Sequence, residues 1–574
     1  MYLKFVKIKN FRKIIQTECL FNPGLNLIVG PNDSGKSAVI DGIRYTLKQI
    51  VDDYSRISSD DFNDPNLEIN IDLIFSFDDR SEEESIIDAA TFAEYLSFND
   101  SDKPELKIWY TLRSNEKDIK FPEFKVGPSK EVAIEMDARC KENLKVVYLR
   151  PLRDAGNELK AKPNSRISKI LSNHKDINNG KETLTKILEN FKNESENFFT
   201  SGEGEPIAKE IKRLLKMFDE QVIPSKDIKF GPTEISNYLK TLEKIALYYT
   251  DLPNPGLGTL NMIFIAAELL HLYTQKNPKL ILIEEIEAHL HPQRQLKIIK
   301  ALQEESKNGP QMILTTHSPN LASLIEVERL NICYNGEFYS LAKGETELAN
   351  NNYNYLRRFL DVTKANLFFA QGVILVEGPT EQLLIPEISK ILGYDLTDYG
   401  ISIICTNGLG FEHFINIFKR KKAPYNKIPI AVITDADNKK STDLEIKLEE
   451  IKNTNNKING FIGEQLYKDS ELNNKEKSTT FEKIIFAKTT ALKKLYIDSY
   501  NTLKKRDEDA AADMNFESIY EKIKNEKAPI AQEVAQQLEN LKNTDENRKI
   551  IKKEIEDYLK YLADAIKFVI PKNE

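Results

Sequence analysis

The chain has 574 residues, with 81 Lys and Arg residues against 89 Asp and Glu residues and a formal net charge of −8. At about 150 residues per domain this length predicts about four domains, and the acidic balance excludes nucleic-acid binding through total charge alone. Its four cysteines are far apart and form no CxxC pair, which excludes a disulfide framework and a zinc ribbon. No apolar stretch suits export or a bilayer span, so we expect a soluble cytoplasmic protein.

Residues 1–153 have a strand-rich pattern that contains a phosphate-binding loop. The apolar run Leu25 to Val29 precedes the sequence GPNDSGKS, and residues 38–48 are helix-like. Glycines in such a loop let backbone N–H groups turn towards the β- and γ-phosphates, the lysine adds positive charge, and the serine hydroxyl holds Mg²⁺. A chance match is the alternative, which the flanking strand and helix disfavour. The predicted ATP-binding residues of the loop are Gly30, Asn32, Asp33, Ser34, Gly35, Lys36 and Ser37, with Ser37 also a metal ligand.

Residues 154–250 change to a helical and polar pattern, interrupted by loop signals at Asn178-Asn179-Gly180 and Ser201-Gly202-Glu203-Gly204. Residues 251–360 return to an α/β pattern. We therefore expect a helical insertion between two lobes of one ATPase, which would serve as a dimerisation or partner arm.

Two buried-strand patterns in the second lobe end in residues suited to ATP hydrolysis. Leu280 to Ile283 is all apolar and leads into Glu284 and Glu285. We predict that Glu284 holds the Mg²⁺ shell and that Glu285 polarises the attacking water, because phosphoryl transfer needs positioning and charge neutralisation. Met312 to Leu314 is followed by His317, which would lie near the γ-phosphate at the neighbouring strand end. A structural histidine is the alternative.

These motifs resemble the ABC-type ATPases of the SMC and RecF kind. The resemblance makes Glu284-Glu285 the Walker B pair, residues 287–292 the D-loop and His317 the switch histidine. It also implies that Arg12, in the turn after the predicted strand Tyr2 to Ile8, binds ATP. No Q-loop is identified. His289 and His291 lack a third ligand and a cysteine pair, so zinc is disfavoured.

A signature-like segment precedes the helical pattern of residues 260–270. Gly256 and Gly258, in GLGT, resemble the signature that completes the nucleotide site of a second subunit in this superfamily, so ATP would close a homodimer. Two residues depart from the usual pattern. Glu284 replaces an Asp, and Pro255 replaces a Ser that contacts the opposing γ-phosphate, which implies slow turnover.

A second acidic constellation follows two further buried-strand patterns. Gly372 to Val376 leads into Glu377 and Glu381, with Pro379 suited to the first position of a helix. Ile428 to Thr434 leads into Asp435 and Asp437, which share a face because they are two residues apart. Carboxylates gathered at parallel strand ends repel one another unless cations bind, and oxygen ligands favour Mg²⁺ or Mn²⁺. Solvated surface charge is the alternative for each residue alone.

The order Glu, NGLG at residues 407–410 and DxD resembles a Toprim domain. An SMC-like ATPase followed by Toprim resembles the OLD (overcoming lysogenization defect) family of nucleases over nearly the whole chain. The resemblance implies that Glu482 is an additional metal ligand and that Lys527 is a catalytic lysine. An ordinary surface carboxylate and a solvated lysine are the alternatives.

We therefore predict an α/β protein: an ABC-type ATPase with a helical insertion, then a Toprim-type parallel sheet with C-terminal helices over residues 365–574. We predict that the protein is an ATP-binding, Mg²⁺-dependent DNA endonuclease with two metal ions in its nuclease site. Glu381 would complete the metal shell, and Lys527 would offset the charge of the transition state. The metal ligands would be Glu377, Asp435, Asp437 and Glu482. An anti-phage role follows from the resemblance alone. The alternatives are a topoisomerase with a tyrosine nucleophile and a non-cleaving RecF-like clamp ATPase. Basic clusters such as residues 419–422 are candidate DNA contacts or solubilising charges.

Overall fold

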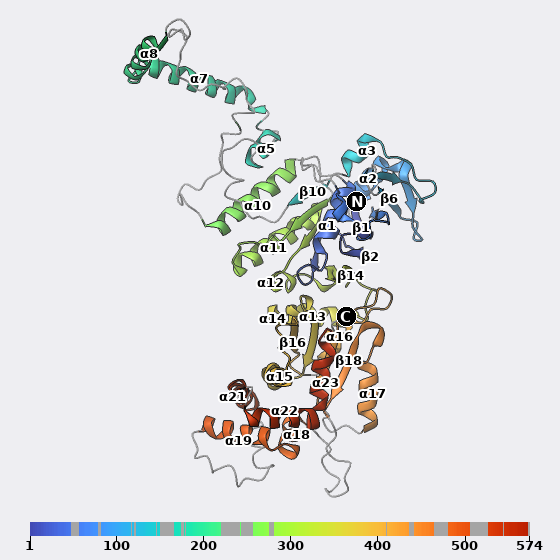
Figure 1. Cartoon of the computed structure of the whole chain (residues 1–574). Helices are drawn as coiled ribbons and strands as arrows, with labels where there is room; N and C mark the ends of the chain where they lie inside the picture. Colours follow the sequence, from blue (N-terminus) through green and yellow to red (C-terminus); the bar gives the residue numbers. More distant parts are fainter. Residues whose placement is uncertain are drawn as a thin grey trace.

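The computed structural model is elongated, with a helical arm, an ATPase body and a second α/β body in succession (Figure 1). No helix among the residues it describes combines the length and apolarity needed to cross a membrane. The structure describes residues 1–47, 57–77, 82–115, 118–119, 122–144, 146–149, 166–173, 177, 179–219, 242, 256–274, 280–408, 410–435, 441–463, 480–504, 526–542 and 545–571.

The first sheet is antiparallel, in the order β2-β1-β4-β6-β5 with β9 paired to β6. Side chains alternate between buried and half-buried along β4, as expected of a sheet with one covered face. Helix α1 (Lys36–Leu47) covers that face so closely that a Cβ on Gly42 would lie 2.9 Å from Cδ1 of Ile8. The strands are β1 Tyr2–Phe11, β2 Ile14–Leu20, β4 Ile69–Ser76, β5 Leu96–Phe98, β6 Pro104–Leu112 and β9 Glu123–Val126.

The second sheet carries the predicted ATPase strands in the order β10-β11-β12-β3-β13-β14. Neighbours from β10 to β13 are parallel, and every residue of β3, β11, β12 and β13 is buried, which explains why these strands are mostly apolar. Thr315 of β12 pairs with Glu284 on one side and with Ile28 of β3 on the other, so three strand ends are level. The strands are β3 Leu25–Val29, β10 Val146–Leu149, β11 Leu280–Glu284, β12 Gln311–Thr315, β13 Leu330–Tyr334 and the antiparallel β14 Glu337–Ser340.

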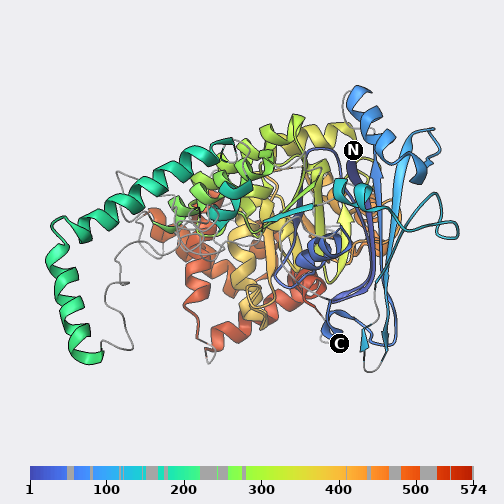
Figure 2. The ribbon, with the colours of Figure 1, turned by 90° about the horizontal axis from the view of Figure 1, so that it is seen from above.

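Helices flank the second sheet and extend from it. Figure 2 shows α7 and α8 reaching away from the body on the side opposite the antiparallel sheet. Helix α7 has no buried residue, and its exposed apolar side chains include Ile187 and Phe191. The helices are α2 Glu82–Thr91, α3 Ala138–Asn143, α5 Arg166–Asn173, α7 Lys181–Thr200, α8 Glu205–Asp219, α10 Leu257–Thr274, α11 Pro292–Asn308 and α12 Pro319–Ala322.

The third sheet is all parallel, in the order β16-β15-β17-β18. Its strands are β15 Gly372–Val376, β16 Ile401–Cys405, β17 Ile430–Thr434 and β18 Ile458–Ile462, and its helices are α15 Pro379–Leu392, α16 Phe411–Phe418 and α17 Ser441–Ile451. The α/β class predicted from the sequence is confirmed. Strand β18 was not predicted from the sequence.

The C-terminal helices are charged on their outer faces and apolar on their inner ones. Apolar side chains of α18 to α23 share one buried cluster with β15, β17 and α15. These helices therefore complete the core of the third sheet. They are α18 Phe481–Lys488, α19 Ala491–Lys504, α21 Lys527–Glu539, α22 Glu546–Tyr558 and α23 Lys560–Val569.

A continuous apolar core joins the second and third sheets through α13 (Asn350–Phe359) and α14 (Val362–Ala365). Arg420 reinforces the junction, since its guanidinium donates to the Ser340 carbonyl (2.9 Å) and pairs with Glu345 (3.1 Å). Arg420 is only 6% exposed. The interpretation of residues 419–422 as a surface basic cluster is therefore wrong for Arg420.

Gln311 joins the two ATPase sheets. Its buried amide accepts from the Leu3 N–H (2.8 Å) and donates to the carbonyls of Leu3 (2.9 Å) and Asn22 (3.1 Å). Gln311→Leu would leave these buried groups unpaired, so we expect the free energy of unfolding to fall by about 3 kcal/mol or more. Urea denaturation measures this, and Gln293→Leu, on the exposed start of α11, is the matched control. Equal stabilities of the two variants would contradict the role of Gln311.

Candidate functional site

The loop before α1 has the backbone of a phosphate cradle. Gly30 and Gly35 have φ values of +148° and +113°, and a Cβ on Gly30 would lie 2.1 Å from the Cys333 carbonyl oxygen, so only glycine fits there. Lys36 is folded into the loop and donates to the carbonyls of Gly30 (2.9 Å) and Pro31 (2.7 Å). Burial lowers the pKa of Lys36 to about 8, and nearby carboxylates oppose that shift. A bound phosphate would stabilise the charged form.

Polar groups around this loop fit a nucleotide phosphate. The Ser34 hydroxyl is buried and has no hydrogen-bond partner within the described residues. Ser37 lies exposed in the first turn of α1, and Asn32 and Asp33 are exposed in the loop itself. Lys13 donates from Nζ to the Asp33 carbonyl (2.8 Å) and so braces the loop.

The two glutamates after β11 have different surroundings. Glu284 is buried, and its Oε1 has no partner in the described part of the chain. Burial, assisted by the charge of Asp41, raises the pKa of Glu284 to about 7. Glu285 has a left-handed φ of +46°, and its Oε1 lies 3.7 Å from Nε2 of His317. The structure therefore brings His317 to Glu285, and burial together with Lys36 lowers the pKa of His317, which favours its neutral form.

Glu287 is a site residue that sequence reasoning placed only at the start of the predicted D-loop. Its carboxylate accepts from the Thr316 hydroxyl (2.7 Å) and from the backbone N–H of His317 (2.6 Å), which fixes the loop that carries His317. Burial raises the pKa of Glu287, and its second oxygen has no partner among the described residues. The one available signal was its position two residues after Glu285.

Arg12 contacts α1 through carboxylates. Its Nε pairs with Asp61 (2.7 Å) and its terminal nitrogen with Asp41 (2.5 Å), which also binds Arg44 (3.0 Å). Asp41 follows Lys36 by five residues on the same helix. Arg12 thus lies beside α1, and both sides of its guanidinium are paired with carboxylates. Its contact with ATP stays a prediction.

The signature-like segment packs on the turn after β11. A Cβ on Gly258 would lie 2.9 Å from the His289 carbonyl oxygen, whereas a Cβ on Gly256 would have no atom of the described residues within 4 Å. The Asn261 amide donates to the Ala288 carbonyl (2.7 Å). Pro255 lies outside the described residues. His291 caps α11 by accepting from the Gln293 N–H (3.3 Å).

The third sheet gathers its predicted carboxylates at the carboxyl ends of β15 and β17. Glu377 accepts a short hydrogen bond from the hydroxyl of Thr434, the last residue of β17, and Thr434 accepts from Lys447 (3.1 Å). Glu381 accepts from the Gly378 N–H (3.1 Å) at the start of α15. Burial, with repulsion from Glu482 and Glu377, raises the pKa of Glu381 to about 7. Sequence reasoning missed Thr434 and Lys447, because neither is acidic and Lys447 lies on a different element.

The remaining candidate residues of this site lie at the starts of α18 and α21 or contact them. Asp435 accepts from the Phe481 N–H (3.1 Å) at the start of α18, and the next residue, Glu482, is only 2% exposed. Lys527, from the start of α21, donates to Glu482 (2.9 Å). The structure thus brings Glu482 and Lys527 together beside Glu381, although they are 45 residues apart.

These carboxylates form an oxygen-rich set that suits a hard cation. Each is turned towards a protein donor, and no three His, Cys, Asp or Glu side chains within the described ranges are grouped to hold a metal ion. Asp437 lies outside the described residues. Metal binding would therefore require these side chains to exchange protein donors for the cation. Burial is the main cause of the raised pKa of Glu381, and the charges of Glu482 and Glu377 add to it.

Comparison with known proteins agrees with this two-part architecture. A family model described as AAA domain, putative AbiEii toxin, Type IV TA system matches residues 25–323, and one described as overcoming lysogenization defect protein-like, TOPRIM domain matches residues 368–437. Old nuclease of Escherichia phage P2 is 26% identical over 452 residues, covering 71% of this chain and 73% of the phage protein.

Two further proteins resemble the chain. Endonuclease GajA of Bacillus cereus strain VD045 is 24% identical over 531 residues, covering 80% of this chain and 87% of the relative. The solved structure of an SMC head bound to the C-terminal winged-helix domain of ScpA aligns with this chain at 15% identity and a TM-score of 0.35. The alignment covers 60% of this chain and 98% of the SMC head chain.

Glu284 gives the nucleotide-free protein a predicted pH dependence. A carboxyl whose pKa is raised from 4.5 to about 7 destabilises the fold as pH rises through that window, because the folded state holds the proton longer. Glu284→Gln cannot ionise. We expect its stability relative to the wild type to increase between pH 5 and pH 8, by up to about 3 kcal/mol.

Urea denaturation at the two pH values measures this difference, with Glu304→Gln on the exposed face of α11 as the control. Saturating Mg²⁺ and ATP should shrink the effect, since a cation favours the ionised carboxylate. A difference between Glu284→Gln and wild type that does not change with pH would show that Glu284 is ionised throughout.

Proposed function

Since the chain belongs to the AAA domain family described as putative AbiEii toxin, Type IV TA system, and continues into an OLD-like TOPRIM domain, we propose that it is an ATP-regulated, Mg²⁺-dependent DNA endonuclease. The observation that carries the proposal is the placement of Glu377 and Asp435 after two neighbouring parallel strands, with Glu381 close to Glu377 and to Glu482, which Lys527 contacts. The names of the relatives, Old nuclease and endonuclease GajA, support hydrolysis of phosphodiester bonds.

In the nuclease half, Glu377, Asp435, Asp437 and Glu482 would hold two divalent ions, Mg²⁺ or Mn²⁺. Such ions supply activation of water and stabilisation of the leaving oxygen. Glu381, with a pKa of about 7, can accept or release a proton at neutral pH. Lys527 is placed to offset negative charge that develops on the phosphodiester, and its bond to Glu482 keeps it oriented before DNA binds.

In the ATPase half, Lys36 and the loop N–H groups would bind the phosphates of ATP, and Glu284 with Ser37 would hold its Mg²⁺. Glu285 polarises the attacking water, and neutral His317 orients Glu285 from 3.7 Å. Gly256 and Gly258 would contact the nucleotide of a second subunit, so that ATP would close a homodimer, and the resemblance of their segment to a signature motif supports this. Anti-phage defence is the proposed cellular role, and the family likeness is what supports it.

The topoisomerase alternative needs a tyrosine that reaches DNA. Two tyrosines close to the carboxylates in the described part of the chain, Tyr496 and Tyr561, are only 3% and 8% exposed, and burial raises the pKa of both hydroxyls. They are unsuited to attack a phosphodiester. A clamp-like ATPase without nuclease activity remains distinguishable by a cleavage assay on supercoiled plasmid with Mg²⁺ or Mn²⁺, with and without ATP.

The two centres should be separable by mutation. Lys36→Ala should abolish ATP hydrolysis, whereas Asp435→Asn should abolish plasmid nicking and leave hydrolysis largely intact, because Asn still accepts the Phe481 N–H bond but loses the charge. Phosphate release and agarose-gel nicking measure the two activities. Asp564→Asn, an exposed position on α23, is the control. Loss of ATP hydrolysis in a folded Asp435→Asn protein would contradict separate centres.

Glu482 tests the number of metal ions. If it holds the second ion, Glu482→Gln should lose most cleavage at low Mg²⁺, because one ligand charge is gone while Glu377 and Asp435 still hold one ion. Excess Mn²⁺ should restore part of the activity, since weakened affinity is overcome by concentration. Nicking rates measured against metal concentration check this.

Glu526→Gln is the matched control, because Glu526 pairs with Lys504 at the neighbouring helix end (2.6 Å). Full cleavage by Glu482→Gln at low Mg²⁺ would leave a one-metal site, with Glu482 acting only through its ion pair with Lys527.

A further inference from the structure

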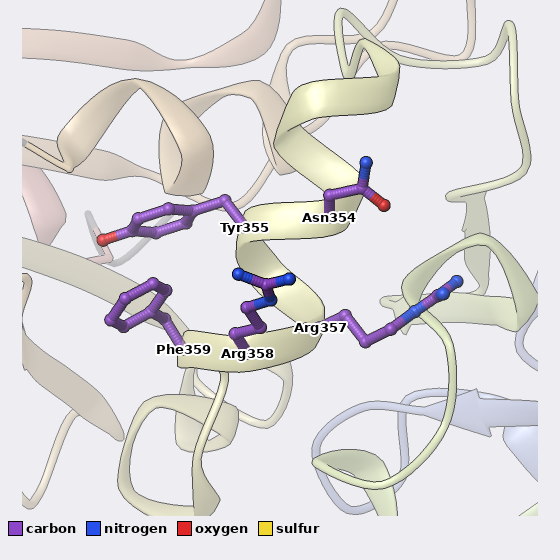
Figure 3. Close-up of a pocket in the computed structure, with 5 residues that line it drawn as sticks. All are labelled: Asn354, Tyr355, Arg357, Arg358 and Phe359. Carbon is purple, nitrogen blue, oxygen red and sulfur yellow. The ribbon is translucent and has the colours of Figure 1, made fainter.

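Helix α13, between the ATPase body and the TOPRIM sheet, carries a pocket of about 380 Å³ that the proposed chemistry does not use. Figure 3 shows Tyr355 and Phe359 projecting together from one side of the helix, with Arg358 beside Phe359 and Arg357 pointing the other way. Asn354 completes the lining. Phe359 is 50% exposed, an unusual exposure for a side chain that already contacts another ring.

Three rings form a column at this pocket. Tyr355 is stacked on Phe359, with centroids 4.3 Å apart and planes 22° apart, and on His413 of α16, at 3.8 Å and 16°. Two rings cannot occupy one face of Tyr355 at these separations, so Tyr355 lies between them. His413 is fixed by a 2.8 Å hydrogen bond with the Asn352 amide, which leaves Phe359 as the outer, half-exposed end of a rigid column.

One guanidinium beside Phe359 is uncompensated, and Glu412 lies beside His413 at the inner end of the column. Arg357 is held by Glu326 (3.3 Å) and Glu328 (3.5 Å). Arg358 is exposed, and no acidic group in the described part of the chain pairs with it. An aromatic face beside an uncompensated guanidinium is the combination that binds a nucleobase and its adjacent phosphate.

The column also reaches the proposed nuclease centre. A Cβ on Gly410 would lie 2.6 Å from the Tyr355 hydroxyl, so the loop after β16 packs directly on the column. In that loop the Gly408 N–H donates to the carbonyl of Glu377 (2.9 Å), and the Thr406 N–H donates to the carbonyl of Val376 (3.0 Å). The column is therefore one short loop away from the first carboxylate of the centre.

We propose that Phe359 and Arg358 form a stacking platform for one unpaired base, and its neighbouring phosphate, of the DNA strand that enters the TOPRIM centre. The proposal rests on the proposed nuclease function. It assigns α13 a role in positioning the substrate. An unpaired base fits, because both faces of a paired base in duplex DNA are already covered by its neighbours.

The test is binding of a fluorescent single-stranded DNA oligonucleotide to the full chain, with Ca²⁺ in place of Mg²⁺ so that bound DNA is read out without depending on cleavage. Phe359→Ala should weaken binding by roughly 5- to 100-fold, the range for loss of one base stack, and Phe359→Trp should restore it. Arg358→Ala should lower the slope of log K against log salt by about 0.7, the value for one single-strand phosphate contact. Arg358→Lys should keep that slope.

Phe98→Ala and Arg113→Ala are matched controls, because both residues are exposed on the antiparallel sheet at 64% and 55%. An abasic nucleotide at the stacked position should weaken wild-type binding as much as Phe359→Ala does, with no further loss when the two are combined. Equal affinity of Phe359→Ala and Phe98→Ala for the oligonucleotide would contradict the proposed platform. The proposal would also be contradicted if Phe359→Ala weakened binding of duplex DNA or RNA more than binding of single-stranded DNA. Failure of wild-type protein to cut any DNA would instead overturn the proposed function, which this binding assay does not require.

Discussion

Carboxyl groups buried at the ends of parallel strands are the constraint on which both centres depend. Glu284 is the last residue of β11, and Glu381 lies at the start of α15, which follows β15. Burial raises the pKa of both carboxyl groups to about 7. A buried negative charge needs a cation or several donors, because desolvation disfavours the ionised form. Lys36 lies near the first group and donates to the carbonyls of Gly30 and Pro31, and Lys527 lies near the second and donates to Glu482. Both edges are thus suited to cations that arrive with a ligand.

The order of strands decides which residues meet at the ATPase edge. Because β12 lies between β3 and β11, the residues after Thr315 face both the phosphate loop and the glutamate pair. Glu287 then ties that segment back to the turn after β11 by bonding Thr316 and His317. A histidine that appears isolated in the sequence is positioned by hydrogen bonds from an element 30 residues away.

The sequence predicted those elements whose burial leaves a simple pattern. Strands such as β3 and β15 are buried at every residue, so their apolar runs stand out and their ends were placed within a residue or two. Strand β18 was missed because Asn459 and Gly460 interrupt its pattern, and only pairing with β17 defines it. Contacts such as Lys447 to Thr434 join separate elements through the tertiary fold, and no local spacing encodes them.

The connection between the two bodies follows from one helix with contacts in both directions. Towards the ATPase, Arg357 of α13 pairs with Glu326 and Glu328, just before β13, which is itself paired with the phosphate-loop strand β3. Towards the TOPRIM sheet, Tyr355 stacks on His413 of α16 and packs on the loop that hydrogen-bonds the backbone carbonyl of Glu377. A packed core responds to displacement as a unit, because its side chains leave no slack. Packed side chains and ion pairs of α13 therefore join the ATPase sheet to the loop beside Glu377.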